Sequence, residues 1–344
     1  MTGIHQLLLT NFAAASGGGA PTSIELFVLA GGASGGGGNV GGGGGAGGLR
    51  MFTAAATLTL TASTTYSIGV GGGGSQANGI GTVGNDGSNS FFSSTGVHIV
   101  ATGGGGGGNA GNTGSGGGDA PRTGGSGGGA SADQIDNNNG INTGASGNAG
   151  GSLNGIPEGF DGGDGLDGSV NRTVAGGGGG ASADGSDASN SPNPATGGAG
   201  GAGKTETITG LDLEIGGGGG GGTDSHSGGN GQSRGGAATH GGGKGATNAS
   251  NGSVAPSHSG FDGEAGTANR GGGGGGAASN VATGSLDEDG MAGGSGLIGI
   301  AYPSSFADIT SIGAGLTVDK SADTTLRTGY KVYTFTAGTG DIEF

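Results

Sequence analysis

Residues 24–49 read IELFVLAGGASGGGGNVGGGGGAGGL, and this order of an apolar segment followed by glycine runs recurs along the chain. The apolar part, residues 24–30, has partial alternation and β-branched residues, which predicts a strand. Residues 66–70, 97–102 and 211–215 are strand-like in the same way and lead directly into further glycine runs. A flexible linker has no need of this repeated order, so we expect the glycine runs to be ordered.

Glycine supplies 103 of the 344 residues, and 25 acidic residues outnumber 10 basic ones, which makes the net charge −15. Because there is no cysteine, disulfides, zinc–thiolate sites and cysteine nucleophiles are excluded. The negative charge argues against nucleic acid as a partner, and no apolar run is long enough to predict a membrane-spanning helix. Glycine costs a helix about 1 kcal/mol per residue, so an α/β enzyme is nearly excluded and almost no α-helix is expected.

The glycine runs do not follow the collagen pattern, which needs glycine at every third position and much proline. Here glycine is continuous in residues 103–108, 216–222 and 271–276, and the chain has only 7 prolines. A glycine helix of the polyproline-II type has three residues per turn and no internal hydrogen bonds, so its backbone groups must bond to neighbouring segments. We therefore predict a mostly irregular and β fold, in which a polyglycine-II helix bundle is flanked by short β-strands.

Changes in composition divide the chain into four predicted segments. They are an N-terminal attachment segment at 1–20, a β layer leading into glycine runs at 21–102, the polyglycine-II bundle with polar loops at 103–296, and a C-terminal β segment at 297–344. Strands are expected at 24–30, 52–70, 91–102, 211–215, 297–302 and 330–335.

Polar loops between the glycine runs are the predicted recognition surface, because loops gathered on a rigid scaffold usually carry binding. The loops at 131–142, 154–173 and 246–270 are the main candidates. Two of them share the tetrapeptide GFDG, at 159–162 and 260–263, which places a scarce phenylalanine beside a carboxylate. An alternative is that each phenylalanine covers the open end of the bundle. The candidate receptor-binding residues are Phe160, Asp161, Asp164, Asp167, His226, His258, Phe261 and Asp262.

Asp161, Asp164 and Asp167 form the densest acidic cluster and are a calcium candidate, because calcium prefers oxygen ligands. Residues 162–170 partly fit the calcium-binding nonapeptide GGxGxDxUx, but Ser169 stands where a large apolar residue is expected and no tandem copy follows. A solvated loop is the simpler interpretation. The histidines show no metal-ligand spacing, and no catalytic constellation or other cofactor site is predicted.

The glycine-rich pattern resembles a known family. The segments that carry the resemblance are GGASGGGGNVGGGGGAGG at 31–48, YSIGVGGGG at 66–74, NDGSNSFF at 85–92, VATGGGGGG at 100–108, GFDGGDG at 159–165 and GTANRGGGGGG at 266–276. Over roughly residues 24–303 the chain is similar to glycine-rich tail-fibre and structural proteins of bacteriophages, above all those of cyanophages. It resembles more loosely the adhesins at the tips of T-even-like long tail fibres, which carry polyglycine-II bundles with receptor-binding loops.

The resemblance implies a non-enzymatic virion protein, a tail-fibre or tail-tip adhesin whose variable loops bind a host-surface glycan or outer-membrane protein. Residues 1–20 would then bind other virion tail or fibre proteins, and a homo-oligomer stays open. The alternative is a subunit of an extracellular structural filament or appendage. No catalytic residues come with the resemblance, so we expect no enzyme activity.

Overall fold

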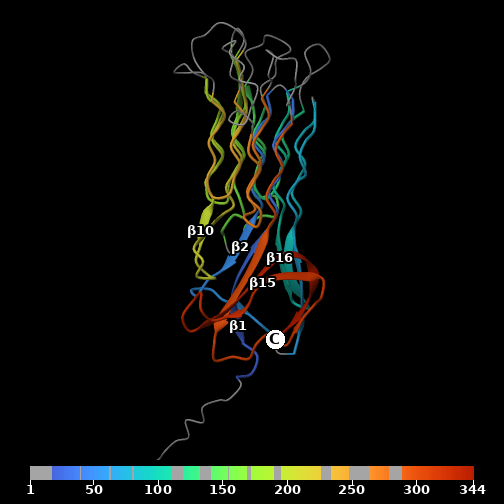
Figure 1. The fold of residues 1–344 in the computed structure, drawn as a ribbon, viewed down its shortest axis with the longest axis vertical. Helices are drawn as coiled ribbons and strands as arrows, with labels where there is room; N and C mark the ends of the chain where they lie inside the picture. Colours follow the sequence, from blue (N-terminus) through green and yellow to red (C-terminus); the bar gives the residue numbers. More distant parts are fainter. Residues whose placement is uncertain are drawn as a thin grey trace, which may run out of the picture.

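The computed structural model divides the chain into a β-barrel-like end and a column of glycine-rich segments that run side by side along the long axis (Figure 1). The structure describes residues 18–38, 40–61, 63–79, 81–110, 119–131, 141–153, 155–168, 172–189, 195–225, 234–247, 263–278 and 289–344. Within these residues every regular element is a strand and there is no α-helix, so the predicted β-rich fold without helices is confirmed for them.

The barrel end is one antiparallel sheet whose outermost strands, β2 and β6, come back close to each other. Its strand order is β2 (Leu49–Phe52), β1 (Ser23–Leu29), β13 (Leu297–Pro303), β16 (Tyr330–Glu343), β4 (Thr65–Val70), β5 (Ser90–Ser94) and β6 (Val97–Ala101). Beside this path, β3 (Leu58–Thr59) pairs with β1, while β14 (Ser311–Ile312) and β15 (Leu316–Asp323) pair with β16. The sheet therefore joins strands from 21–102 with strands from 297–344.

Smaller strands lie along the column. The hairpin of β10 (Lys204–Glu206) and β11 (Leu213–Ile215) is separate from a small sheet ordered β12 (Thr223–Ser225), β9 (Arg172–Val174), β8 (Gly165–Gly168) and β7 (Ile141–Asn142). The strands predicted at 24–30, 211–215, 297–302 and 330–335 are confirmed in β1, β11, β13 and β16, and the prediction at 91–102 is divided by a turn into β5 and β6. The strand predicted at 52–70 is wrong as a single element, because a turn and a break separate β2, β3 and β4 there.

The long strand β16 links the two halves of the barrel. Its residues 330–335 pair with β13, and its residues 338–343 pair with β4. Gly338 lies where the partner changes and has a φ of +87°, in the region that side chains rarely adopt. A Cβ there would lie 1.9 Å from the carbonyl oxygen of Gly315, so glycine allows the strand to bend at this point.

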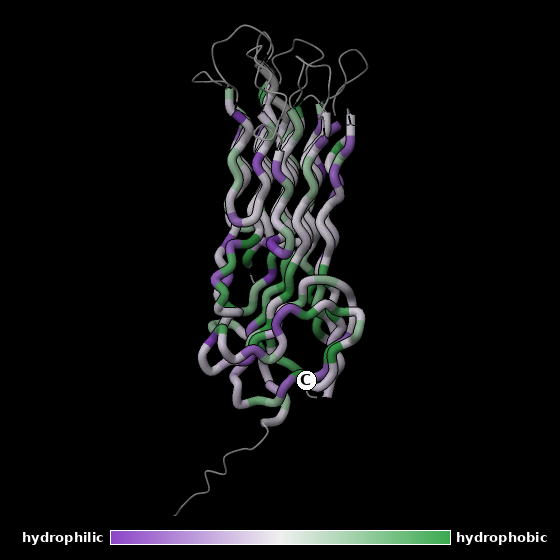
Figure 2. The backbone as a smooth tube through the Cα atoms, viewed as in Figure 1, coloured by the Kyte–Doolittle hydropathy of each residue, from purple (hydrophilic) through white to green (hydrophobic). Residues whose placement is uncertain are grey.

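The apolar core is confined to the barrel end, where green colouring gathers in Figure 2, while the column is pale. Leu26, Ile68, Phe92, Ile300 and Phe335 are fully buried inside the barrel. A second cluster lies on its outer face, where Ile208 and Ile215 of the β10–β11 hairpin segment cover Phe27, Leu297 and Val332. The large apolar residues of the described chain are thus concentrated at the barrel end, in one cluster inside the barrel and one on its outer face.

The column is held by backbone hydrogen bonds that repeat every three residues. The N–H groups of Gly42, Gly43 and Gly44 donate to three different segments, at the carbonyls of residues 108, 176 and 274. The next three N–H groups, of residues 45–47, donate to residues 105, 179 and 271 of the same three segments. Segment 40–48 therefore donates to three neighbours, antiparallel to 102–108 and 271–277 and parallel to 176–179. Its carbonyls accept from three further segments, 33–36, 126–129 and 219–222, so it is bonded on all sides.

Inner and outer segments of the column differ in composition for a steric reason. In the inner segment a Cβ on Gly43 or Gly44 would lie 2.0 or 2.3 Å from a neighbouring carbonyl oxygen. In an outer segment, residues 84–89 read GNDGSN, and only Gly84 and Gly87 meet a neighbour that closely. Asp86 and the residues after Gly87 are exposed. A segment bonded on all sides is therefore glycine at nearly every position, with only small residues such as Ala46 between, whereas an outer segment needs glycine only at every third position.

We expect Gly105→Ala to destabilise the protein and Gly72→Ala to leave it intact. A Cβ at Gly105 would lie 1.9 Å from the Arg122 carbonyl oxygen, whereas at Gly72 nothing lies within 4 Å. Overpacking of this kind costs about 1–3 kcal/mol, while an unstrained Gly→Ala change stabilises by about 0.4–1 kcal/mol through the unfolded state. Thermal unfolding of both variants measures the difference. Equal melting temperatures would contradict the close packing of the column.

Candidate functional site

The far end of the column, opposite the barrel, is where most of the chain's internal connections begin and end (Figure 1). Isolated bridges tie the flanking residues together there, joining Gly38 to Ala110, Val40 to Ala278, Thr196 to Arg234 and Thr223 to Thr247. The connections that start from these flanks are 111–118, 132–140, 190–194, 226–233, 248–262 and 279–288. The predicted recognition loop 131–142 therefore starts and finishes at this end. The predicted loop 246–270 starts there, but its described part, 263–270, runs along the column and ends beside β1 at the barrel end, so it is not a loop throughout.

The predicted site residues fall into two groups. Phe160, Asp161 and Asp164 lie on a described outer segment of the column, and Asp167 lies in β8, where its side chain is not described. His226, His258, Phe261 and Asp262 lie outside the described residues. The third predicted loop, 154–173, is not a loop throughout, because residues 159–168 run along the column.

Asp161 and Asp164 are hydrogen-bond acceptors for an adjacent outer segment. The Oδ1 atom of Asp161 accepts the Gly147 N–H at 2.8 Å, and Oδ1 of Asp164 accepts the Gly144 N–H at 2.9 Å. The three-residue spacing of the two carboxylates matches the three-residue spacing of the two amides. Each carboxylate thus stands in for the backbone carbonyl that a further glycine segment would supply.

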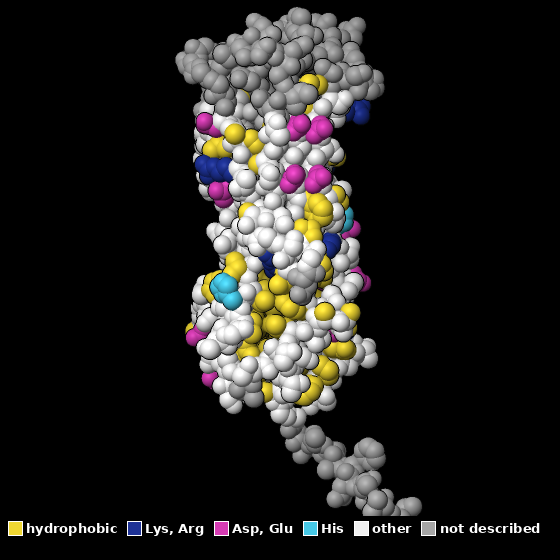
Figure 3. Space-filling view, turned by 180° about the vertical axis from the view of Figure 1, so that it is seen from behind, with side chains coloured by type: hydrophobic (Ala, Val, Ile, Leu, Met, Phe, Trp, Pro, Cys, Tyr) yellow, Lys and Arg dark blue, Asp and Glu magenta, His cyan; other side chains and the backbone are white. Residues whose placement is uncertain are grey.

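The same arrangement recurs on two further outer segments. Asp184 and Asp187 accept the backbone N–H groups of Asp161 and Asp164 at 3.0 and 2.8 Å. On another side, Asp86 and Asn89 accept the N–H groups of Gly106 and Gly103. We call these six residues the edge acceptors; acidic side chains are visible on the column surface in Figure 3. Sequence reasoning missed Asp184 and Asp187, although their i, i+3 spacing was the available signal.

The calcium hypothesis stays a prediction. Among the residues that the structure describes, no group of three or more His, Cys, Asp or Glu side chains is arranged to hold a metal ion. One oxygen of Asp161 and one of Asp164 already bind backbone N–H groups. These two residues therefore have a structural role that does not need a cation.

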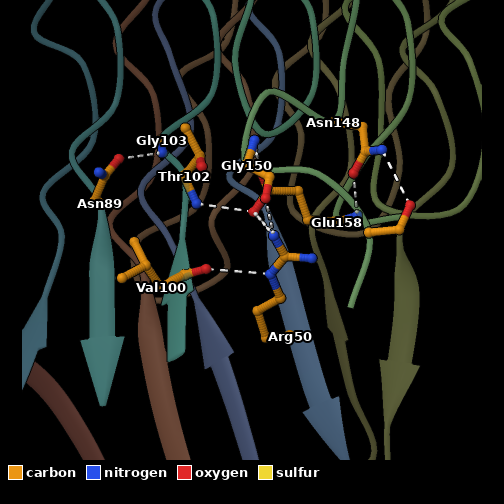
Figure 4. A network of polar contacts seen from close by, with 9 residues as sticks. Arg50, Asn89, Val100, Thr102, Gly103, Asn148, Gly150 and Glu158 are labelled. Atoms are coloured by element: carbon orange, nitrogen blue, oxygen red, sulfur yellow. Dashed lines mark hydrogen bonds and ion pairs between the residues drawn. The ribbon is translucent and has the colours of Figure 1, made fainter. Parts of the chain in front are cut away.

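A buried ion pair joins the barrel to the column (Figure 4). Arg50 of β2 lies 3.1 Å from Glu158, and the two side chains are 6% and 0% exposed. Arg50 Nε also donates to the Val100 carbonyl of β6 at 3.2 Å. The Glu158 carboxylate accepts the N–H groups of Thr102 and Gly150. Removing one partner of such a buried pair lowers the free energy of unfolding by about 3–5 kcal/mol. This network therefore stabilises the place where β2 and β6 meet the column.

A second buried carboxylate, Glu206, lies in the β10–β11 hairpin. Burial raises its pKa above the ordinary value of 4.5, although the hydroxyl and N–H of Thr209 donate to it and partly offset the shift. The nearby charge of Asp212 adds to the increase. Arg327 does not contact this carboxylate; it donates to the Ile208 carbonyl and to Glu25 at 3.0 Å each. The Glu206 carboxyl in this hairpin therefore stays protonated to a higher pH than an exposed glutamate does.

Comparison with known proteins identifies no relative. No family model, no curated protein and no solved structure matches the chain. Within the described residues, no helix is long and apolar enough to cross a membrane.

We expect Asp164→Ala to lower stability by about 1 kcal/mol, because the Gly144 N–H loses its acceptor, and Asp164→Asn to change it little, because an amide oxygen still accepts. Thermal unfolding in calcium and in chelator measures both variants. An edge acceptor predicts the same order of stabilities in both solutions. A calcium ligand predicts that wild type melts higher in calcium and that Asp164→Asn loses this response.

We expect Glu206→Gln to alter the pH dependence of stability. Because the folded-state pKa is raised, the folded protein binds more protons than the unfolded chain above about pH 4.5, and stability falls as the pH rises from there through the folded-state pKa. Glutamine removes this slope, so the variant gains stability relative to wild type as the pH rises above about 4.5. Glu214→Gln, at an exposed position of the same hairpin, is the control and should retain the slope. Parallel curves for wild type and Glu206→Gln would contradict the assignment.

Proposed function

We propose that the glycine column is a polyglycine-II bundle and that the protein is a non-enzymatic tail-fibre or tail-tip adhesin of a phage virion. The barrel end, with residues 1–20, would attach it to other virion tail or fibre proteins. The connections at the far end of the column would bind a host-surface glycan or outer-membrane protein.

The hydrogen-bond period supports the polyglycine-II part of this proposal. A helix with three residues per turn directs successive N–H groups to three sides, and segment 40–48 donates to three neighbours in strict rotation. Continuous glycine at residues 41–45 of the inner segment, and glycine at every third position of residues 84–89, fit the same helix. Diffraction from oriented samples would test it through the axial rise of about 3.1 Å per residue.

The separation of the two ends of the molecule carries the functional part of the proposal. The described chain begins at residue 18 and ends at residue 344 at the barrel, so both ends lie away from the bridged flanks of the long connections (Figure 1). A rigid column between a base and a set of polar connections is what a receptor-binding tip requires.

Charge restricts the receptor chemistry. The connections 132–140, 248–262 and 279–288 contain aspartate or glutamate and no lysine or arginine. Negatively charged cell-surface groups would repel such segments at long range. The proposed receptor is therefore a neutral glycan or a basic protein patch, bound by the amide and hydroxyl groups that these connections contain in large number.

We expect replacement of 132–140 and 248–262 by Gly-Ser segments of equal length to abolish cell binding while the melting temperature stays unchanged. The control replaces residues 53–57, an exposed turn of the barrel, in the same way. Binding of fluorescently labelled protein to a panel of cyanobacteria and other aquatic bacteria is the measurement. Binding that survives the tip replacement would move recognition to the barrel end, and helical filaments in electron micrographs would favour the structural-filament alternative.

A further inference from the structure

The barrel has one open seam, between β2 and β6. These two strands are the ends of the sheet path, and within the described ranges β2 pairs only with β1 and β6 only with β5. Near the column the seam is bridged by side chains, through the Arg50 bond to the Val100 carbonyl. Farther from the column no such bridge is present among the described residues. An unpaired edge of this kind is a template for a further strand.

Backbone groups of both edge strands face the seam. The Val100 carbonyl accepts from Arg50, so by alternation the N–H and C=O groups of His98 also point away from β5. On the other edge the Leu49 N–H donates to Glu158, so the backbone groups of Met51 point away from β1. These strands can accept hydrogen bonds from, and donate them to, an added segment.

The borders of the seam are apolar. Leu58 of β3, Val97 of β6 and Leu153 of the turn before Glu158 are only partly buried and pack against the barrel core. Ile156, in the same turn as Leu153, is 54% exposed and is the most exposed large apolar side chain of the described residues. Hydrophobic side chains also gather on the surface of the barrel end in Figure 3. An occupant of the seam should therefore be apolar and extended.

We propose that the apolar N-terminal segment of the same chain, residues 4–12, binds in this seam as an added strand along β6. This segment, IHQLLLTNF, includes the run Leu7–Leu9 and has no charged residue. The inference does not depend on the adhesin proposal. The other apolar face of the barrel is already covered by the chain itself, through the β10–β11 hairpin.

The place where the described chain begins makes this occupant reachable. The Thr22 carbonyl accepts the Leu60 N–H, and Ser23 pairs with Thr59, so the chain enters the barrel beside β3 on the seam side of β1. The described chain begins at Gly18, and the Ala307 N–H donates to the Gly19 carbonyl, which fixes residues 18–22 at the barrel. Between residues 12 and 18 an extended chain spans about 20 Å, which exceeds the length of a five-residue strand, about 17 Å. The N-terminal segment can therefore reach either border of the seam without rearrangement of β1.

Engineered cysteines test the proposal in the full chain, which has none of its own. Cysteine at Leu7, Leu8 or Leu9 is combined with His98→Cys on β6, or with Thr317→Cys, an exposed position on β15, as the control. We expect at least one His98→Cys pair to form an intramolecular disulfide readily, and the matching control pair to form little. Equal cross-linking at both positions, cross-linked dimers instead of monomers, or no cross-linking would each overturn docking within one chain.

Hydrogen exchange gives a second measure that does not need cysteine. The triple variant Leu7→Ser, Leu8→Ser, Leu9→Ser is compared with Ala13→Ser, Ala14→Ser, Ala15→Ser in the same N-terminal segment. We expect the His98 and Val100 amides to exchange about tenfold faster in the leucine variant than in the alanine variant, because loss of the docked strand exposes them. Equal exchange rates in folded samples of the two variants would overturn the proposal.

Discussion

Hydrogen bonds between backbones that carry no side chains are the interaction on which this molecule depends. Gly44, for example, donates to Gly274 and accepts from Gly219, at 2.9 Å in each case. Ordering one residue costs about 1–2 kcal/mol, and more for glycine, while one hydrogen bond contributes about 0.5–1.5 kcal/mol. A single glycine run would therefore remain disordered. The column is stable only because each inner run is bonded on several sides at once, and because the barrel brings the runs together.

The boundary of the column follows from the same constraint. An outermost segment lacks a neighbour on its outer side, so the amides facing it need other acceptors. Carboxylates and an amide oxygen at Asp86, Asn89, Asp161 and Asp164 supply them, at the three-residue spacing of the hydrogen bonds in the column. Five of the 25 acidic residues, the aspartates among the edge acceptors, thus have a structural role. The same side chains carry negative charge, which would make the columns of neighbouring molecules repel one another.

Sequence alone predicted the strands whose apolar residues lead into glycine runs, because alternation and the following glycine are local signals. It also indicated that the runs are ordered. It did not reveal that β2 and β6 meet, that Arg50 and Glu158 pair across 108 positions, or that Asp184 bonds to the Asp161 amide. These contacts depend on which runs are neighbours in space. Since glycine runs are identical to one another, their sequence carries no information about which neighbour each one chooses.

That identity raises the problem of register. A glycine run that slides by three residues along its neighbours recovers the same hydrogen bonds, so the glycine backbone by itself does not fix its own position. Residues with side chains must do so. Ser126 is fully buried and donates to the Gly180 carbonyl at 3.0 Å, and the Ser34 hydroxyl accepts the Asn85 N–H at 2.7 Å. Such bonds exist in one register only. Scattered serines in the runs, together with barrel strands at their ends, therefore select one alignment from a set that glycine alone would leave equal in energy.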